Sequence, residues 1–305
     1  MQDWRAQLDD ALGEKVDFNV PLANKVAFKI GGPADAFAKP VTSDDLALIL
    51  RIADDARQPI TILGTGSNVL VSDKGIRGIT IRLSGSLTEV VLLEETSDFG
   101  VIRVGSGALN PPVVSKALKH DLIGIEFLAT IPGTFGGALI MNAGAHGGEI
   151  GPFVQEVSVL VPGQGAVIRP GAECGFTYRN SSFSRTEIIT EAVLRIPKGD
   201  SDKARSHLKE MRSRRKATQP IREPNAGSIF KNPEGDYAGR LIEACGLKGL
   251  RKGGACISPK HANFIVNENS ATATDVSELA EVARREVREK FSVDLHWEVK
   301  RIGEW

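Results

Sequence analysis

Apolar side chains recur at the spacing of an α-helix in three stretches of the chain. A residue of a type that commonly caps helices stands before each stretch, as expected at a helix start. The stretches are residues 43–58 after Thr42, residues 111–118 after Asn110 and residues 275–291 after Thr274. Each of them predicts one amphipathic helix.

Short apolar runs that end in glycine, proline or polar turns predict β-strands. They cover residues 60–63, 75–83, 89–95, 99–108, 186–196 and 294–303, and residues 154–170 predict a β-hairpin. The charged residues 198–220 predict a solvated helix that links two units, and we place the boundary near residue 199. The first two-thirds of the chain is therefore expected to be mixed α/β, and the boundary divides the chain into domains at residues 1–198 and 199–305.

The composition favours a small molecule as the partner. The 305 residues suffice for two hydrophobic cores. The 38 Lys and Arg residues balance the 38 Asp and Glu residues, so the chain lacks the excess of positive charge that would indicate binding to nucleic acid or to a membrane surface. The sequence has neither an apolar signal segment nor an apolar run long enough to span a bilayer, which predicts a cytoplasmic protein. The cysteines form no C-x-x-C pair and the histidines are scattered, so no metal site is expected.

A glycine loop follows the predicted strand at residues 60–63. It contains Gly64 and Gly66 but no third glycine, and it continues into another extended segment, so it matches the dinucleotide fingerprint poorly. The backbone N–H groups around Gly64, Gly66, Ser67 and Asn68 could instead form a concave nest for a pyrophosphate. A plain hairpin turn is the alternative interpretation.

Two further loops are rich in glycine. The run at residues 131–151 is hard to explain by packing, because each glycine in regular structure costs roughly 0.5–1 kcal/mol relative to alanine. A flat ligand lying against the backbone would offset that cost. The loop at residues 29–37 adds Gly31 and Gly32. Three such loops favour a large cofactor over turns alone.

Six segments of the chain are similar, in this order, to motifs of one enzyme family. They read KIGGPADAFAKP, ILGTGSNVLVSDKGIRGITIRL, GIEFLATIPGTFGGALIMNAGAHGGEIG, FTYRNSSF, PNAGSIFKNPEGDYAGRLIEACGLKG and ISPKHANFIVN. The chain thereby resembles the UDP-N-acetylenolpyruvoylglucosamine reductases, bacterial flavoenzymes of peptidoglycan precursor synthesis, in the form that lacks an extra tyrosine-bearing loop. Ala129, Phe135 and His146 depart from the family's usual residues.

The resemblance implies an α+β fold whose FAD-binding domain, at residues 1–198, is related to oxidases that can hold FAD covalently and has subdomains at about residues 1–85 and 86–198. It also implies an α/β substrate-binding domain at residues 199–305, whose last strand packs back on the first domain. The loops GTGSNVL and KIGGPAD contain no His or Cys, so non-covalent FAD is expected, with NADPH as hydride donor. The implied FAD-binding residues are Gly31, Gly32, Gly64, Gly66, Ser67, Asn68, Gly133, Thr134, Gly137, Asn142 and Ala143.

The resemblance also implies a reaction, the reduction of UDP-N-acetylglucosamine enolpyruvate to UDP-N-acetylmuramate through reduced FAD. Ser228 takes the position of the proton donor, Arg179 that of the cation at the substrate carboxylate, and Glu298 that of a carboxyl group beside it. The implied substrate-binding residues are Tyr178, Lys216, Asn232 and His261. Taken alone, these residues also fit a turn serine, a surface salt bridge, a solvent-facing glutamate and a structural histidine.

Three other functions fit parts of the sequence. One is an oxidase of an alcohol or sugar on the related flavin fold, and another is a non-catalytic sensor of a UDP-sugar or nucleotide. The third is a serine hydrolase built on Ser228, which lacks a G-x-S-x-G motif and a histidine in a triad context. A monomer is favoured as the oligomeric state.

Overall fold

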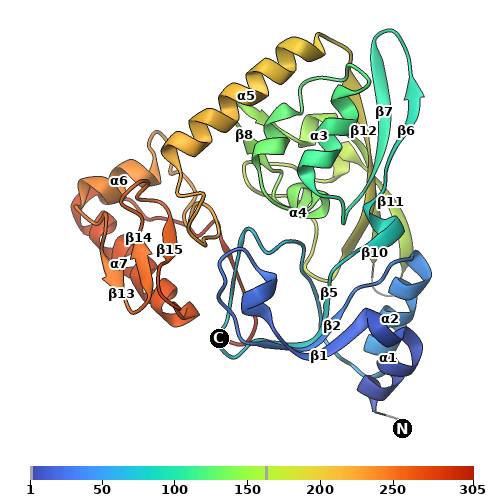
Figure 1. Ribbon diagram of the computed structural model, residues 1–305, viewed down its shortest axis with the longest axis horizontal. Helices are drawn as coiled ribbons and strands as arrows, with labels where there is room; N and C mark the ends of the chain where they lie inside the picture. The colour runs from blue at the N-terminus through green and yellow to red at the C-terminus, as the bar shows by residue number, and fades with distance from the viewer. Residues whose placement is uncertain (1–2, 162–163) are drawn as a thin grey trace. The chain divides into compact units, whose positions relative to one another are not determined.

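Runs of strands and groups of helices follow one another along the chain in the computed structural model (Figure 1), which describes residues 3–161 and 164–305. The α-helices are α1 (Trp4–Leu12), α2 (Ser43–Asp55), α3 (Asn110–Leu118), α4 (Phe135–Ile140), α5 (Ser201–Thr218), α6 (Ala238–Ala244) and α7 (Ala273–Phe291). The longer strands are β1 (Val16–Pro21), β2 (Pro33–Ala38), β5 (Ile76–Ile81), β6 (Val90–Glu95), β7 (Phe99–Gly105), β10 (Val154–Val161), β11 (Gly165–Pro170) and β12 (Ile188–Pro197). The shorter strands are β3 (Ile60–Ile62), β4 (Val69–Val71), β8 (Gly144–Ala145), β9 (Gly148–Glu149), β13 (Arg251–Lys252), β14 (Ala255–Ile257), β15 (Ile265–Asn267) and β16 (Lys300–Ile302). This mixture of helices with largely antiparallel sheets confirms the α+β class.

The chain folds into two compact units, each assembled from separate segments. Unit 1 consists of the chain up to Asp17 together with Ala38–Gly64 and Ile81–Ser213. Unit 2 consists of Phe18–Phe37, Thr65–Thr80 and Arg214–Trp305. The predicted division into FAD-binding residues 1–198 and substrate-binding residues 199–305 stays a prediction, because it concerns which ligand each part binds. The resemblance implied only that the last strand packs back on the first domain, and it did not predict that Phe18–Phe37 and Thr65–Thr80 both join the C-terminal part within unit 2.

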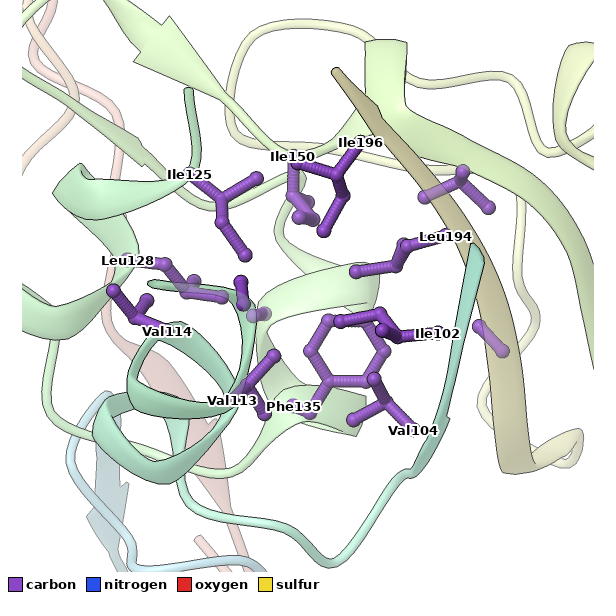
Figure 2. Close-up of a cluster of buried hydrophobic side chains, with 14 of the residues drawn as sticks. Ile102, Val104, Val113, Val114, Ile125, Leu128, Phe135, Ile150, Leu194 and Ile196 are labelled. Carbon is purple, nitrogen blue, oxygen red and sulfur yellow. The ribbon is translucent and has the colours of Figure 1, made fainter. Parts of the chain in front are cut away.

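An antiparallel sheet covered by helices forms the centre of unit 1. Its strands lie in the order β11–β10–β12–β7–β6. Figure 1 shows α3 and α4 on one side of this sheet, and Figure 2 shows the buried side chains that they share with it, among them Val113, Phe135 and Leu194. Phe135 has no exposed surface, and burial of such a side chain contributes about 1.5–3 kcal/mol. The loop that leads into α4 is therefore firmly anchored.

Unit 2 has a core of its own around α7. The apolar face of this helix packs with Phe230 and with Phe28, Ile30 and Leu70, which come from the two N-terminal segments. β13, β14 and β15 form a small antiparallel sheet beside the helix, while β16 pairs in parallel with β4. The C-terminal strand thus lies beside the segment that follows the first glycine loop.

The three predicted amphipathic helices are confirmed as α2, α3 and α7, but only the cap of α2 is as predicted. Thr42 accepts a hydrogen bond from Asp45 N, and the Asp45 side chain accepts one from Thr42 N, which makes a capping box. Asn110 is the first residue of α3 instead of its cap, which is Leu109, and its amide nitrogen donates to Ile131 O at 3.0 Å. Its amide oxygen, the atom that would accept in a helix cap, is buried without a hydrogen-bond partner among the described residues.

The cap of α7 is Thr272, two residues before the predicted Thr274. Thr272 and Asp275 form the capping box, while the Thr274 hydroxyl donates to the carboxylate of Asp73 at 2.9 Å. Both threonines precede the apolar repeat, but only Thr272 is followed three residues later by an acidic residue, so a local capping box was the signal that favours it.

The predicted strands up to residue 197 and the hairpin of β10 and β11 are confirmed, with residues 162 and 163 of its turn lying outside the described residues. The predicted strand at 294–303 is too long, since only Lys300–Ile302 forms a strand and Trp297 makes an isolated bridge. The predicted solvated helix is α5, but its Ala204, Leu208 and Met211 are buried in the core of unit 1.

Candidate functional site

Gly64 and Thr134 lie against each other in unit 1, so two of the predicted FAD-binding loops meet there. A Cβ atom on Gly64 would lie 2.4 Å from Thr134 Oγ1, closer than real Cβ contacts allow. Phe135 N, next along the chain, donates to Ala108 O at 2.7 Å and holds the second loop in place. The structure therefore brings these two predicted residues together.

The glycines at the start of α4 leave room for a ligand. Gly133 has a φ of 146°, a conformation that favours glycine. A Cβ atom on Gly137 would meet, among the described residues, only Thr134 Oγ1 at 3.6 Å, an ordinary contact distance. Glycine within a helix costs about 1 kcal/mol relative to alanine, so neighbouring protein atoms do not explain Gly137. A flat group held against the backbone would explain it, and FAD fits this loop.

Asn142 follows α4 directly, and its side chain forms hydrogen bonds to the backbone of two later segments. Its side chain has no exposed surface, and its Oδ1 accepts from Gly151 N at 2.9 Å while its Nδ2 donates to Thr177 O at 3.1 Å. The φ of Asn142 is 39°, and Ala143 beside it is buried. Asn142 thus connects the predicted FAD-binding loop to the segment that carries the predicted catalytic arginine.

Arg179 sits in a tight turn in a strained backbone conformation. Thr177 and Asn180 exchange backbone hydrogen bonds across the turn, and the φ of Arg179 is 53°. One guanidinium nitrogen donates to Gly144 O at 2.7 Å, and the guanidinium carbon lies 5.0 Å from the ring centre of Tyr178. A left-handed conformation costs a residue with a long side chain about 1–3 kcal/mol, and such strain clusters at functional sites. Arg179 and Tyr178, both predicted site residues, are therefore held side by side.

Packing within unit 2 accounts for three other predicted FAD-binding glycines. A Cβ atom at any of them would collide with a neighbouring loop of the same unit. The distances would be 2.7 Å from Gly31 to Val71 Cβ, 2.2 Å from Gly32 to Asp73 O and 2.5 Å from Gly66 to Val26 Cγ1. These glycines are needed because neighbouring loops of unit 2 pack closely against their Cα atoms. Their contact with FAD stays a prediction.

The loop after Gly64 contains a buried hydroxyl group, that of Thr65, without a hydrogen-bond partner among the described residues. Leaving a buried hydroxyl without a partner costs about 1–3 kcal/mol. Asn68, separated from it by Gly66 and Ser67, accepts from Lys300 N at 3.0 Å and donates from Nδ2 to Glu298 O at 3.4 Å. A polar ligand on this loop would satisfy Thr65, and the same loop contacts the backbone of a predicted catalytic residue.

Ser228 and Glu298 lie on neighbouring segments of unit 2. Glu298 N donates to Ile229 O at 2.8 Å, and Phe230 forms an isolated β-bridge with Trp297. The rings of Phe230 and Trp297 also meet edge to face, with 5.6 Å between their centres. The segments that carry the predicted proton donor and the predicted carboxyl group are thus paired through their backbones, although they are distant in sequence.

Two predicted substrate-binding residues lie at the ends of helices in unit 2. Lys216 is in the last turn of α5, and its backbone O accepts from Lys260 Nζ at 2.6 Å. Asn232 accepts with Oδ1 from Ala238 N at 3.1 Å, at the start of α6. The bond from Lys260 brings Lys216 close to the segment that contains His261.

His261 has a structural role in the turn before β15. Its Nδ1 accepts from Asn263 N at 3.2 Å, and its ring packs edge to face on Phe264 with 4.8 Å between centres. Burial, assisted by the charge of Lys248, lowers the pKa of His261 below its usual value. The neutral imidazole that can accept this hydrogen bond is therefore favoured, and substrate binding by His261 stays a prediction.

Two polar residues of these segments were not singled out in the sequence. Thr65 stands between two glycines of a predicted nest, so its hydroxyl could have been considered as a ligand contact. Asn263 is only 3% exposed although it lies in the apolar stretch ANFIV, where a lone asparagine was the available signal. In the described parts of the chain, no helix is both long and apolar enough to cross a membrane.

The chain matches two family models. That of an FAD binding domain covers residues 34–171, and that of the UDP-N-acetylenolpyruvoylglucosamine reductase C-terminal domain covers residues 219–302. The UDP-N-acetylenolpyruvoylglucosamine reductase 2 of Symbiobacterium thermophilum is 44% identical over 286 residues, which cover 93% of this chain and 91% of that protein. The reductase of Caldanaerobacter subterraneus is 42% identical over 291 residues, 95% of this chain and 94% of that one.

A solved structure is similar over the same length. The crystal structure of UDP-N-acetylenolpyruvylglucosamine reductase from Thermus caldophilus superposes with a TM-score of 0.78 at 35% identity, and covers 94% of this chain and 97% of that chain. Sequence and fold therefore agree on one assignment across almost the whole length. The chain belongs to the UDP-N-acetylenolpyruvoylglucosamine reductase family.

Proposed function

We infer that this chain reduces UDP-N-acetylglucosamine enolpyruvate to UDP-N-acetylmuramate in peptidoglycan precursor synthesis, as an oxidoreductase that uses FAD and NADPH. Membership of the family over nearly the full length supports the activity. The observation that carries the assignment of roles is the backbone pairing that joins the segments of Ser228 and Glu298 in unit 2.

The protein groups around the glycine loops support FAD as the resident cofactor. No described neighbour explains the missing side chain of Gly137 or supplies a partner for the Thr65 hydroxyl. Bound FAD supplies the hydride, which it receives from NADPH. We propose that loop amides and short side chains of unit 1 hold it, namely those of Gly64, Gly133, Thr134, Gly137 and Ala143.

Arg179 is proposed to stabilise the charge that develops on the substrate. Hydride addition at the methylene carbon moves the π electrons toward the substrate carboxylate, which becomes an enolate. A guanidinium bonded to that carboxylate binds it more strongly as negative charge grows, and such groups contribute about 10²–10³ in rate. The strained turn, the bond to Gly144 O and the stacking on Tyr178 support a fixed orientation for this cation.

Ser228 is proposed to complete the reduction. Its O–H bond breaks as a C–H bond forms at the carbon that carries the carboxylate, and the serine oxygen then recovers a proton from solvent. An enolate is a strong base, so a hydroxyl of ordinary acidity suffices when it is correctly placed. Gly227, with a φ of 78°, sets the direction of the chain into Ser228. Glu298 is proposed to act at the same carboxylate, because its segment pairs with Ile229.

The test is oxidation of NADPH by the purified yellow protein with and without the enolpyruvyl sugar. We expect consumption of NADPH to require the sugar and to yield one UDP-N-acetylmuramate per NADPH. An alcohol or sugar oxidase would instead form hydrogen peroxide from its substrate without NADPH. A colourless protein, or NADPH oxidation that is independent of the sugar, would contradict the proposal.

Two finer features belong to the proposal. A cytoplasmic location is in keeping with NADPH and a nucleotide sugar as substrates, and a monomer is favoured. Sedimentation at micromolar concentration would test the second, since a mass near the 32.7 kDa of one chain is expected.

A further inference from the structure

The side chain of Asn263 forms hydrogen bonds to the backbone of Phe230, two residues after Ser228. Asn263 Oδ1 accepts from Phe230 N at 3.0 Å, and Asn263 Nδ2 donates to Phe230 O at 2.8 Å. The backbone O of Asn263 accepts from Ile229 N at 2.8 Å. Asn263 therefore makes three hydrogen bonds to the two residues that follow Ser228.

Asn263 is itself fixed on both sides. Its backbone N donates to His261 Nδ1 at 3.2 Å within the turn, and the chain beyond Phe264 continues into β15. Its side chain is 3% exposed, so water has little access to these bonds. In this environment, a Phe230 N–H or C=O group left without a partner would cost about 1–3 kcal/mol.

The opposite edge of the same segment faces the chain around Glu298. Lys231 N donates to His296 O at 2.8 Å, and Glu298 N donates to Ile229 O at 2.8 Å. Residues 229–231 are thus held between Asn263 on one side and residues 296–298 on the other. A shift away from Asn263 would move the Ser228 hydroxyl relative to Glu298.

We propose that Asn263 is a positioning residue that sets the Ser228 hydroxyl for proton transfer to the substrate carbon. This inference rests on the proposed function of Ser228. Proton transfer requires donor and acceptor within hydrogen-bond reach, and a displacement of about 1 Å can slow a reaction on the order of 10²-fold. The amide of Asn263 supplies its donor and its acceptor on two separate atoms, whereas an ionised carboxylate has no donor and a hydroxyl has a single oxygen for both bonds.

The experiment separates the two half-reactions of the FAD-loaded enzyme without oxygen. Rapid mixing with NADPH measures flavin reduction, and mixing of the reduced enzyme with the enolpyruvyl sugar measures reoxidation. Wild type, Asn263→Asp, Ser228→Ala and the double variant are compared. Asp275→Asn serves as control, because it weakens the capping box of α7 in the same unit and touches neither Ser228 nor Phe230.

Asn263→Asp should slow reoxidation by about 10–100-fold, with flavin reduction within about twofold of wild type. In the Ser228→Ala background the same change should add no further slowing, because the group it positions is gone. Asp275→Asn should lower thermal stability and leave both rates unchanged. If Asn263→Asp does not fold, Asn263→Ser, which admits water to Phe230, should show a smaller slowing with the same dependence on Ser228.

Two results would overturn different parts of the account. Equal slowing by Asn263→Asp with and without Ser228 would show that Asn263 does not act through the serine. Wild-type reoxidation by Ser228→Ala would instead remove the proposed proton donor itself. The first result refutes this inference alone, and the second refutes the function on which it rests.

Discussion

The carboxylate of Asp73 should contribute measurably to the stability of unit 2. Asp73 comes shortly after β4, and its side chain accepts from Ala273 N at 2.7 Å, from Thr274 N at 3.0 Å and from Thr274 Oγ1 at 2.9 Å. These donors form the first turn of α7, whose apolar face fills the core of the unit. One side chain thus joins a strand near the N-terminal glycine loop to the main C-terminal helix.

The magnitude of the effect follows from these contacts. Loss of a capping acceptor costs about 1 kcal/mol, and loss of a negative charge at a helix N-terminus costs about 0.3–1 kcal/mol. The third bond, from the Thr274 hydroxyl, adds about 1 kcal/mol. Thr274 is exposed, so water recovers part of this. Asp73→Ala should therefore lower the free energy of unfolding by about 2 kcal/mol, and Asp73→Asn by about 1 kcal/mol.

Urea unfolding followed by tryptophan fluorescence measures this change. Trp297 packs on Phe230 in unit 2, so its emission reports on that unit. With a urea dependence of about 2 kcal/mol per molar, the midpoint of Asp73→Ala should fall by about 1 M. Asp44→Asn, in the first turn of α2, is the control and should cost at most about 0.5 kcal/mol. An Asp73→Ala midpoint equal to that of Asp44→Asn would refute the reasoning.

Three further outcomes are expected. Gly64→Ala should weaken FAD binding by at least about tenfold in a fluorescence titration, because its Cβ would lie 2.4 Å from Thr134 Oγ1; unchanged affinity would contradict the placement of the loop. Arg179→Ala should slow anaerobic reoxidation by about 10²–10³-fold and spare flavin reduction, whereas equal slowing of both would indicate general damage. The pKa of His261 is lowered in the folded state, so the unfolded chain takes up its proton first, and the free energy of unfolding should fall as the pH drops below about 6.5. His261→Gln should reduce this loss between pH 7 and 5.5, and an identical pH dependence in both proteins would count against the histidine as its source.

Local patterns were sufficient to predict elements whose ends are decided locally. The apolar repeat behind Thr42 predicted α2 with its cap, because both partners of the capping box lie within one turn. The same reasoning placed the cap of α3 one residue late, at Asn110, whose backbone N and amide nitrogen instead donate to Gly133 O and Ile131 O on a later loop. The residues near a helix do not predict a hydrogen-bond partner that lies on a distant segment of the chain.

The candidate site shows the same limit. Resemblance singled out Ser228 and Glu298 one at a time, and each alone also fitted an ordinary surface residue. Their segments are paired through Phe230 and Trp297, which depends on the fold of the whole unit. Asn263 was missed for a related reason, since the sequence shows an asparagine but neither its burial nor its bonds to Phe230.

The central claim is that Ser228 donates the proton that completes reduction of the enolpyruvyl group. Its most direct test is the rate at which the NADPH-reduced, anaerobic Ser228→Ala enzyme is reoxidised by the enolpyruvyl sugar, with Ser206→Ala on the exposed side of α5 as control. The account predicts reoxidation slowed by about 10²–10⁴-fold in Ser228→Ala, flavin reduction near the wild-type rate, and no change in Ser206→Ala. Reoxidation of Ser228→Ala at the wild-type rate would contradict it.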